Sequence, residues 1–251
     1  MQLFKIEIDR LISEIRNYIL DNVISLLDVF LICLGIFLGA GQEFFQEKTL
    51  FYALVGMILW RYTVVCLQTA CNIIQKEIRL GTLEQLMLAK YSLLELVIIR
   101  LLAKLLVETI RMIIISIVLI SVFHIQVSFN INIGLILLAI AICLAGTIGI
   151  GCLVAGIALV YKKANALVNS VSYFTLFFTG LIVPLEVLSP FFSNIAMLLP
   201  FYWCVTVIRQ NILGVEFFSL LTLSIFWVVI GKVFFNCAIH RVISNGATSK
   251  Y

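Results

Sequence analysis

Charged residues and prolines are scarce in this sequence. Asp, Glu, Lys and Arg make up 12% of the 251 residues, whereas soluble domains carry about 25%. Only 3 prolines occur, and no polar segment is long enough to bury a core of its own. Because 63% of the residues are hydrophobic, the composition excludes a soluble globule and predicts a single integral membrane domain over residues 1–251.

The sequence also lacks the motifs of nucleotide and catalytic sites. It has no G-x-x-x-x-G-K-[ST] loop to hold the phosphates of ATP, and GTIGIG at 146–151 follows no strand. A membrane-embedded enzyme would need clustered His, Asp or Glu, but the histidines are only His124 and His240, on opposite predicted sides. We therefore expect no catalytic residue and no cofactor in the chain itself. Because Lys and Arg are spread along the chain, we expect no nucleic-acid partner.

Cysteine pairs in a C-x-x-C pattern are absent as well. The 7 cysteines fall in or beside apolar runs, which favours small buried side chains over a metal site or a disulfide framework. They are Cys33, Cys66, Cys71, Cys143, Cys152, Cys204 and Cys237.

The largest polar segment is residues 75–95, QKEIRLGTLEQLMLAKYSLLE. Gly81 within it is suited to the C-terminal end of a helix. Two later pairs have the spacing of capping boxes, which start helices: Thr82 with Gln85, and Ser92 with Glu95. The pattern predicts a short amphipathic helix between two long ones, the shape of a docking element at a membrane surface. A well-capped connector fits the same spacing.

The first 21 residues predict an amphipathic helix. Apolar residues recur at helical spacing from Phe4 to Ile19, and charged residues occupy the rest of the helix wheel. Such a helix lies in the membrane interface rather than crossing the bilayer.

Six apolar runs of about 20 residues follow, each long enough to cross a bilayer. They lie at residues 22–40, 51–74, 101–123, 133–160, 166–183 and 217–238. With six crossings, 14 of the 17 Lys and Arg residues fall on one side or in its flanks, and such an excess marks the cytoplasmic side. We therefore expect an all-α polytopic protein with both termini and the segment at 75–95 in the cytoplasm.

One charged stripe lies in the third predicted span. Arg100, Lys104, Glu108 and Arg111 fall within about 80° of one another on the helix wheel, and Glu108 has helical spacing to both Lys104 and Arg111. Lipid tails do not solvate such a stripe. A cytoplasm-facing cavity and snorkelling to the inner headgroups both satisfy it.

Two further ionisable residues lie deeper, Asp28 in the first span and Arg61 in the second. Their depths differ by roughly 10 Å, a gap that a long arginine side chain partly bridges. We expect a structural ion pair between them, with a substrate contact as the alternative.

The last three predicted spans carry small or polar residues. The fourth contains small residues on which another helix can pack closely: Ala141, Ala145, Gly149, Gly151, Ala155 and Gly156. The fifth is polar, and we favour helix–helix contacts over a substrate route for its side chains: Asn165, Asn169, Ser170, Ser172, Thr175 and Thr179. A proline-broken apolar stretch at 184–200 then predicts a re-entrant hairpin of short helices on the outer side.

Two of these stretches resemble a known family. KEIRLGTLEQLMLAKYSLLELVIIRLLAKL resembles the E-x-x-x-G-T-L-E-x-L segment of membrane subunits of ATP-binding-cassette (ABC) type-2 exporters. GLIVPLEVLSPFFSNIAMLLPFYWCVTVIRQNILG is similar to the late proline-broken stretch of that family, which is followed by an arginine. With six spans and the amphipathic N-terminal helix, the resemblance covers nearly the whole chain.

The resemblance implies a multi-pass permease subunit of a bacterial cytoplasmic membrane. Its implied partners are the lipid bilayer, a second permease copy or a different permease subunit, and a cytoplasmic dimer of ATPase subunits that bind ATP and Mg²⁺. Residues 82–90 would form the coupling helix inserted into the ATPase, begun by Gly81, Thr82, Leu83, Glu84, Gln85 and Leu86. The outer re-entrant helices would include Pro184, Glu186, Pro190 and Pro200.

The resemblance also ranks the functions. An arginine–aspartate–lysine pattern associated with polysaccharide-exporting members is not evident before the first span. Export of a drug, an antimicrobial peptide or another amphipathic substrate is therefore favoured over export of a polysaccharide or lipid-linked glycan. An ion-gradient-driven secondary transporter is the alternative from another class, and Asp28 and Glu108 are the acidic groups it would use.

Overall fold

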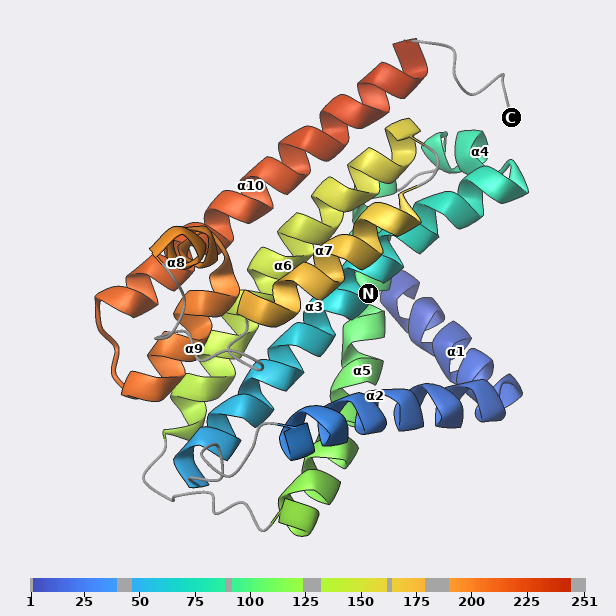
Figure 1. Cartoon of the computed structure of the whole chain (residues 1–251). Helices are drawn as coiled ribbons and strands as arrows, with labels where there is room; N and C mark the ends of the chain where they lie inside the picture. Colours follow the sequence, from blue (N-terminus) through green and yellow to red (C-terminus); the bar gives the residue numbers. More distant parts are fainter. Residues whose placement is uncertain are drawn as a thin grey trace.

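Helices make up the regular structure in the part of the chain that the computed structural model describes, which is residues 2–39, 47–88, 92–123, 132–161, 164–178 and 190–244 (Figure 1). The helices are α1 (Gln2–Asn17), α2 (Ile19–Gly39), α3 (Glu47–Leu80), α4 (Leu83–Met87), α5 (Leu93–Phe123), α6 (Ile133–Tyr161), α7 (Asn165–Phe178), α8 (Pro190–Met197), α9 (Pro200–Gln210) and α10 (Val215–Ser244).

Four described helices are long and apolar enough to cross a membrane, namely α3 from Phe51 to Leu80, α5, α6 and α10. The predicted spans at 51–74, 101–123, 133–160 and 217–238 lie within them. Two bent helix pairs raise the number of candidates to six if each counts as one span. The predicted first span falls on α2, and the described part of the fifth falls on the 14-residue α7. Residue 40 and residues 179–183 lie outside the described residues.

The first bent pair is α1 with α2, which meet at 91°. The bend is at Tyr18, where the Asn22 side-chain amide donates to the backbone carbonyl oxygens of Tyr18 at 2.7 Å and Ile15 at 3.4 Å. The Tyr18 carbonyl oxygen also accepts from the backbone N–H of Asn22 at 3.1 Å, so Asn22 holds the junction through both its backbone and its side chain. The amphipathic helix predicted within residues 1–21 is thus α1, and it ends before the apolar α2 begins.

The second bent pair is α8 with α9, which meet at 94°. Pro190 begins α8 and Pro200 begins α9, positions where a missing N–H costs no helical hydrogen bond. The hairpin of short helices predicted at 184–200 corresponds in part to this pair, which continues to Gln210. Pro184 and Glu186 lie outside the described residues.

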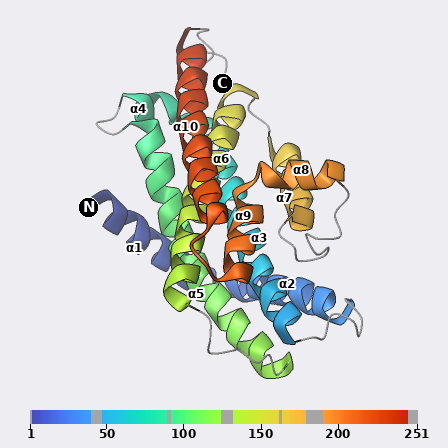
Figure 2. The ribbon, with the colours of Figure 1, turned by 90° about the vertical axis from the view of Figure 1, so that its left-hand side faces the viewer.

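Helix α6 packs against both α3 and α10 (Figures 1 and 2). The contact with α10 is close because glycines of α6 face it: a Cβ atom built on Gly149 would lie 2.5 Å from the backbone carbonyl of Trp227. Gly156 faces Phe234 and Phe235 of α10 in the same way. The predicted packing stripe is therefore confirmed at these glycines, whereas Ala141 and Ala145 are exposed.

Replacing Gly149 by alanine is expected to destabilise the protein by about 1–3 kcal/mol, because the added methyl group meets backbone atoms that side-chain rotation cannot move. The measurement is the thermal unfolding midpoint of the purified full chain in detergent. Gly35→Ala in α2 is the matched control, since a Cβ there would meet no atom within 4 Å. Equal midpoints for the two variants would contradict the close α6–α10 contact.

Polar residues of α7 attach this helix to α3. The indole N–H of Trp60 donates to the Ser172 carbonyl oxygen at 3.0 Å, and the Cys71 thiol donates to the Asn165 side-chain oxygen at 3.4 Å. The predicted helix–helix role of the side chain is confirmed for Asn165, whereas Ser172 contacts α3 through its backbone carbonyl and its hydroxyl has no partner among the described residues. Six of the seven cysteines are buried, as the sequence predicts, whereas Cys237 is exposed.

Candidate functional site

The connection between α3 and α4 is a Schellman turn. Gly81 has φ +67°, its N–H donates to the Ile78 carbonyl oxygen, and the N–H of Thr82 donates to that of Glu77, both at 3.1 Å. This 6→1 and 5→2 pair of hydrogen bonds ends a helix through a residue in the left-handed conformation. The predicted role of Gly81 as a helix terminator is confirmed.

The first predicted capping box is not formed. The Thr82 hydroxyl donates to the Glu77 carboxylate at 2.6 Å, rather than bonding with the backbone of Gln85. A nearly buried carboxylate is a stronger acceptor for the hydroxyl than a helix terminus can offer. The second box is formed: the Ser92 N–H donates to Glu95 Oε2 at 3.1 Å, and the Glu95 N–H donates to Ser92 Oγ at 3.2 Å.

Helix α4 is shorter than the predicted helix at 82–90. It ends at Met87, and residues 89 and 90 lie outside the described residues. Leu83 is 3% exposed and belongs to an apolar cluster with Ile74 and Leu93, which fixes α4 to the ends of α3 and α5. Glu84 follows Leu83 in α4, the Gln85 side chain is exposed, and Leu86 packs partly against the core.

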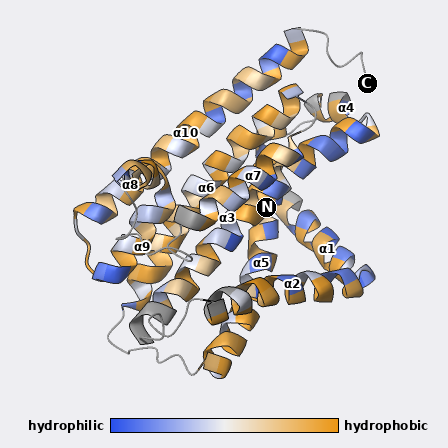
Figure 3. Ribbon diagram, in the orientation of Figure 1, coloured by the Kyte–Doolittle hydropathy of each residue, from blue (hydrophilic) through white to orange (hydrophobic). Residues whose placement is uncertain are grey.

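Helix α4 lies at the same end of the molecule as the C-terminal ends of α6 and α10 (Figures 1 and 2). The end of α3 beside α4, together with α1, carries many of the hydrophilic residues (Figure 3). The end with α4 therefore brings together the last turns of α3 and α10, whose basic residues Arg79 and Arg241 the sequence groups on one predicted side.

A three-helix ion cluster, formed by Glu7 of α1, Glu77 of α3 and Arg100 of α5, lies beside the α3–α4 turn. The Arg100 guanidinium contacts Glu7 Oε1 through Nε at 2.9 Å and Glu77 Oε1 through Nη1 at 2.8 Å. Glu7 also pairs with Arg10 at 2.9 Å. Glu7 and Glu77 are only 6% and 8% exposed. The cluster therefore joins the amphipathic helix to both long helices that hold α4.

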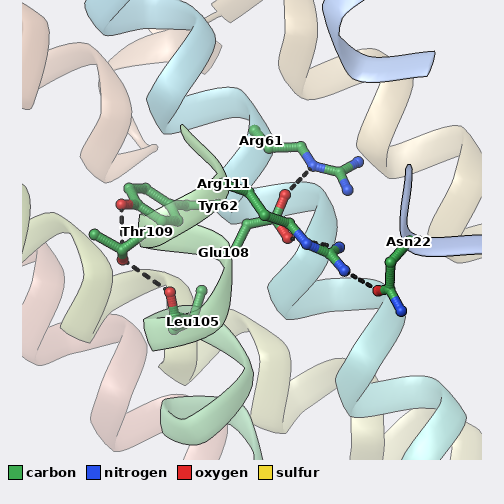
Figure 4. Close-up of polar contacts among 7 residues, drawn as sticks. All are labelled: Asn22, Arg61, Tyr62, Leu105, Glu108, Thr109 and Arg111. Atoms are coloured by element: carbon green, nitrogen blue, oxygen red, sulfur yellow. Dashed lines mark hydrogen bonds and ion pairs between the residues drawn. The ribbon is translucent and has the colours of Figure 1, made fainter. Parts of the chain in front are cut away.

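A second charged group, the intramembrane network, consists of Asn22, Arg61, Glu108 and Arg111 (Figure 4). The Glu108 carboxylate accepts from Arg61 Nε at 2.5 Å and from Arg111 Nη1 at 3.5 Å. Arg111 also donates to the Asn22 side-chain oxygen. Glu108 is 1% exposed, so the two arginines supply the charge compensation that its burial requires.

This network corrects two predictions. The expected ion pair between Asp28 and Arg61 is absent among the described residues, because Arg61 pairs with Glu108 and the Asp28 side chain lies on the exposed side of α2. The helical spacing between Lys104 and Glu108 also gives no ion pair, whereas that between Glu108 and Arg111 does.

A basic cavity of about 720 Å³ opens between α1, the start of α2, the end of α3, and α5. Its cationic lining residues are Arg10, Lys76, Lys104 and Arg111. A second cavity of about 210 Å³ adjoins it and shares Arg10, Lys76 and Lys104, with Arg100 in its wall. Lys104 and Arg111 of the charged stripe on α5 line the larger cavity, and Arg100 and Lys104 line the smaller one. The choice between a cytoplasm-facing cavity and snorkelling to the headgroups stays a prediction.

No group of three or more His, Cys, Asp or Glu within the described ranges is placed to hold a metal ion.

Several long apolar helices, two bent helix pairs and buried charge clusters between helices define a multi-pass helical membrane protein. A family model described as ABC-2 type transporter matches residues 3–213. The chain therefore belongs to the ABC-2 type transporter family and is a permease component of an ABC transporter. A comparison with curated proteins finds no match. Membership of this family implies an ATPase partner in the ABC system.

Proposed function

We propose that this chain exports a drug, an antimicrobial peptide or another amphipathic substrate, driven by ATP that a separate ATPase dimer hydrolyses. The observation that supports the proposal is the way in which α4 is attached to the neighbouring long helices. Leu83 and the Schellman turn at Gly81 fix this short helix to the ends of α3 and α5. A force applied to α4 therefore reaches two long helices directly, which suits a coupling helix.

The three-helix ion cluster extends this coupling to α1, because Arg100 contacts carboxylates on α1 and α3 together. ATP-driven closure of the ATPase dimer would push α4, and the attached helices would shift between inward-open and outward-open arrangements. Such a change is a switch between two packed states, biased from a distance.

The intramembrane network supports an ATP-driven mechanism over an ion-gradient-driven one. A carboxylate that carries protons or sodium ions has to release its counter-charge, but Glu108 is held by two arginines. Dependence of export on ATP in proteoliposomes, with no dependence on an imposed ion gradient, would agree with the proposal.

Replacing Glu84 by lysine is expected to leave membrane insertion intact and to reduce transport-coupled ATP hydrolysis to background. The reversed charge on α4 would oppose docking of the ATPase. The measurement is substrate-stimulated ATPase activity of the purified complex in proteoliposomes.

Glu216→Lys provides the matched control, because it makes the same charge reversal in the first turn of α10. The opposite, C-terminal end of α10 is the one that lies at the same end of the molecule as α4 (Figures 1 and 2). Glu216 accepts one exposed hydrogen bond from Gln210. Normal transport by the Glu84→Lys variant would count against the assignment. Co-purification would identify the ATPase and distinguish two copies of this chain from two different permease subunits.

A further inference from the structure

The basic cavity lies at the bend between α1 and α2. Its walls come from the polar side of α1, the first turns of α2, and the segments of α3 and α5 beside them. Because α1 is amphipathic and meets the apolar α2 at 91°, this bend belongs at the boundary between headgroups and acyl chains. The volume of about 720 Å³ is within the range of ligand sites in proteins.

Two of the four cations in the cavity wall are already compensated. Arg10 pairs with Glu7, and Arg111 pairs with Glu108 and bonds to Asn22. Lys76 and Lys104 differ, because neither forms an ion pair or hydrogen bond with another residue in the described ranges. Lys104 is also half-buried. A half-buried ammonium group at membrane depth is costly without an anion beside it.

The carboxylates of Glu14 and Glu108 attract Lys104 from a distance, but neither forms an ion pair with it. Glu14 and Asp21 line the cavity, but both are exposed and neither lies within 4 Å of the two lysines. The cavity wall therefore carries four cations and two exposed carboxylates, and neither the half-buried Lys104 nor the exposed Lys76 has a carboxylate in direct contact.

An apolar surface continues from the cavity along the bend. Ile19 and Leu20 at the start of α2 are 59% and 77% exposed, and Tyr18 lines the cavity itself. A ligand with an anionic head in the cavity could thus lay acyl chains along α2. A free anion would use only the polar half of this arrangement.

We propose that the cavity between α1, α2, α3 and α5 binds the phosphate headgroup of an anionic phospholipid through Lys76 and Lys104. A zwitterionic headgroup fits less well, because its own cation would compete with the lysines for the phosphate. Basic pockets beside membrane helices bind anionic headgroups by the same electrostatics. The inference depends on the membrane location of α1 and not on the transported substrate.

The test measures how strongly the purified full chain selects spin-labelled phosphatidylglycerol over spin-labelled phosphatidylcholine in phosphatidylcholine vesicles. We expect a clear preference in the natural chain, and a loss of up to about 25-fold in Lys76→Gln/Lys104→Gln, since each such cation contributes a factor of about five. Lys76→Arg/Lys104→Arg should retain the preference. Lys5→Gln is the matched control, because Lys5 is exposed on α1 outside the cavity wall.

Inorganic phosphate separates a lipid from a soluble anion. If added phosphate leaves the labelled phosphatidylglycerol bound, the lipid is the occupant, and displacement by phosphate would overturn that assignment. An unchanged preference in the double glutamine variant, or an equal loss in Lys5→Gln, would overturn the site as a whole. The single variants Lys76→Gln and Lys104→Gln provide the same comparison if the double variant fails to fold.

Discussion

Replacing Glu108 by glutamine is expected to destabilise the protein by about 3–5 kcal/mol, the usual cost of removing one partner from a buried ion pair. Glu108 is 1% exposed and faces both Arg61 and Arg111. The variant would leave two guanidinium groups between membrane helices without a counter-charge, because Asn22 offers Arg111 only a neutral oxygen. The measurement is the yield of folded protein from membranes, with its thermal unfolding midpoint.

Asp28→Asn is the control for this variant, since it also removes a carboxylate from a predicted span, but the Asp28 side chain is exposed. It should change the unfolding midpoint little. The double variant Arg61→Gln/Glu108→Gln should recover part of the lost stability, because one uncompensated cation then remains instead of two. If Asp28→Asn lowers the unfolding midpoint as much as Glu108→Gln does, the network contributes no more to stability than an exposed carboxylate.

The contrast between Asp28 and Glu108 shows where helical periodicity stops being informative. The spacing of Glu108 and Arg111 on one helix predicts their contact, and the structure confirms it. The partner of Arg61 depends on how three helices rotate about their axes and slide along one another, which no local pattern encodes. The membrane depths estimated from the sequence place Asp28 within reach of Arg61, but α2 is rotated so that the Asp28 carboxylate is exposed.

The two capping boxes make the same point at shorter range. Ser92 and Glu95 bond reciprocally, and neither side chain has another hydrogen-bond partner among the described residues. Thr82 has the same spacing to Gln85, but its hydroxyl bonds to Glu77, which the burial of the preceding turn brings close. Sequence rules therefore predicted the break at Gly81 and the start of α5, but not the bond that connects α3 with the α4 turn.

The three-helix ion cluster could be predicted only in part. The amphipathic pattern of residues 1–21 predicts α1, and the stripe on α5 identifies Arg100 as a residue that needs a polar environment. That Glu7 meets Arg100 follows from the fold of α1 back onto α5. A carboxylate on an amphipathic helix normally faces water, so no local pattern distinguishes Glu7 from the other acidic residues of α1.

Replacing Arg100 by glutamine is expected to destabilise the protein by about 1–3 kcal/mol, the cost of leaving buried polar partners unsatisfied. The loss is smaller than for Glu108, because Glu7 keeps Arg10 and Glu77 keeps the hydroxyl of Thr82. Arg79→Gln is the matched control: Arg79 is exposed near the end of α3, and its Nε donates to the backbone of Gln75. Unfolding midpoints in detergent compare the two variants.

Coupling energies test whether Arg100 joins the helices or merely fills space. Double-mutant cycles of Arg100→Gln with Glu7→Gln and with Glu77→Gln should each give about 0.5–3 kcal/mol, the range for residues in one network. Arg100→Lys keeps the charge but loses the planar fork that contacts two carboxylates together, so it should fall between the natural chain and Arg100→Gln. If α1 moves with α4 as proposed, Arg100→Gln in the assembled transporter should also hydrolyse more ATP for each substrate molecule exported. Zero coupling in both cycles would mean that α1 is held to α5 by apolar contacts alone, and that the cluster transmits nothing between them.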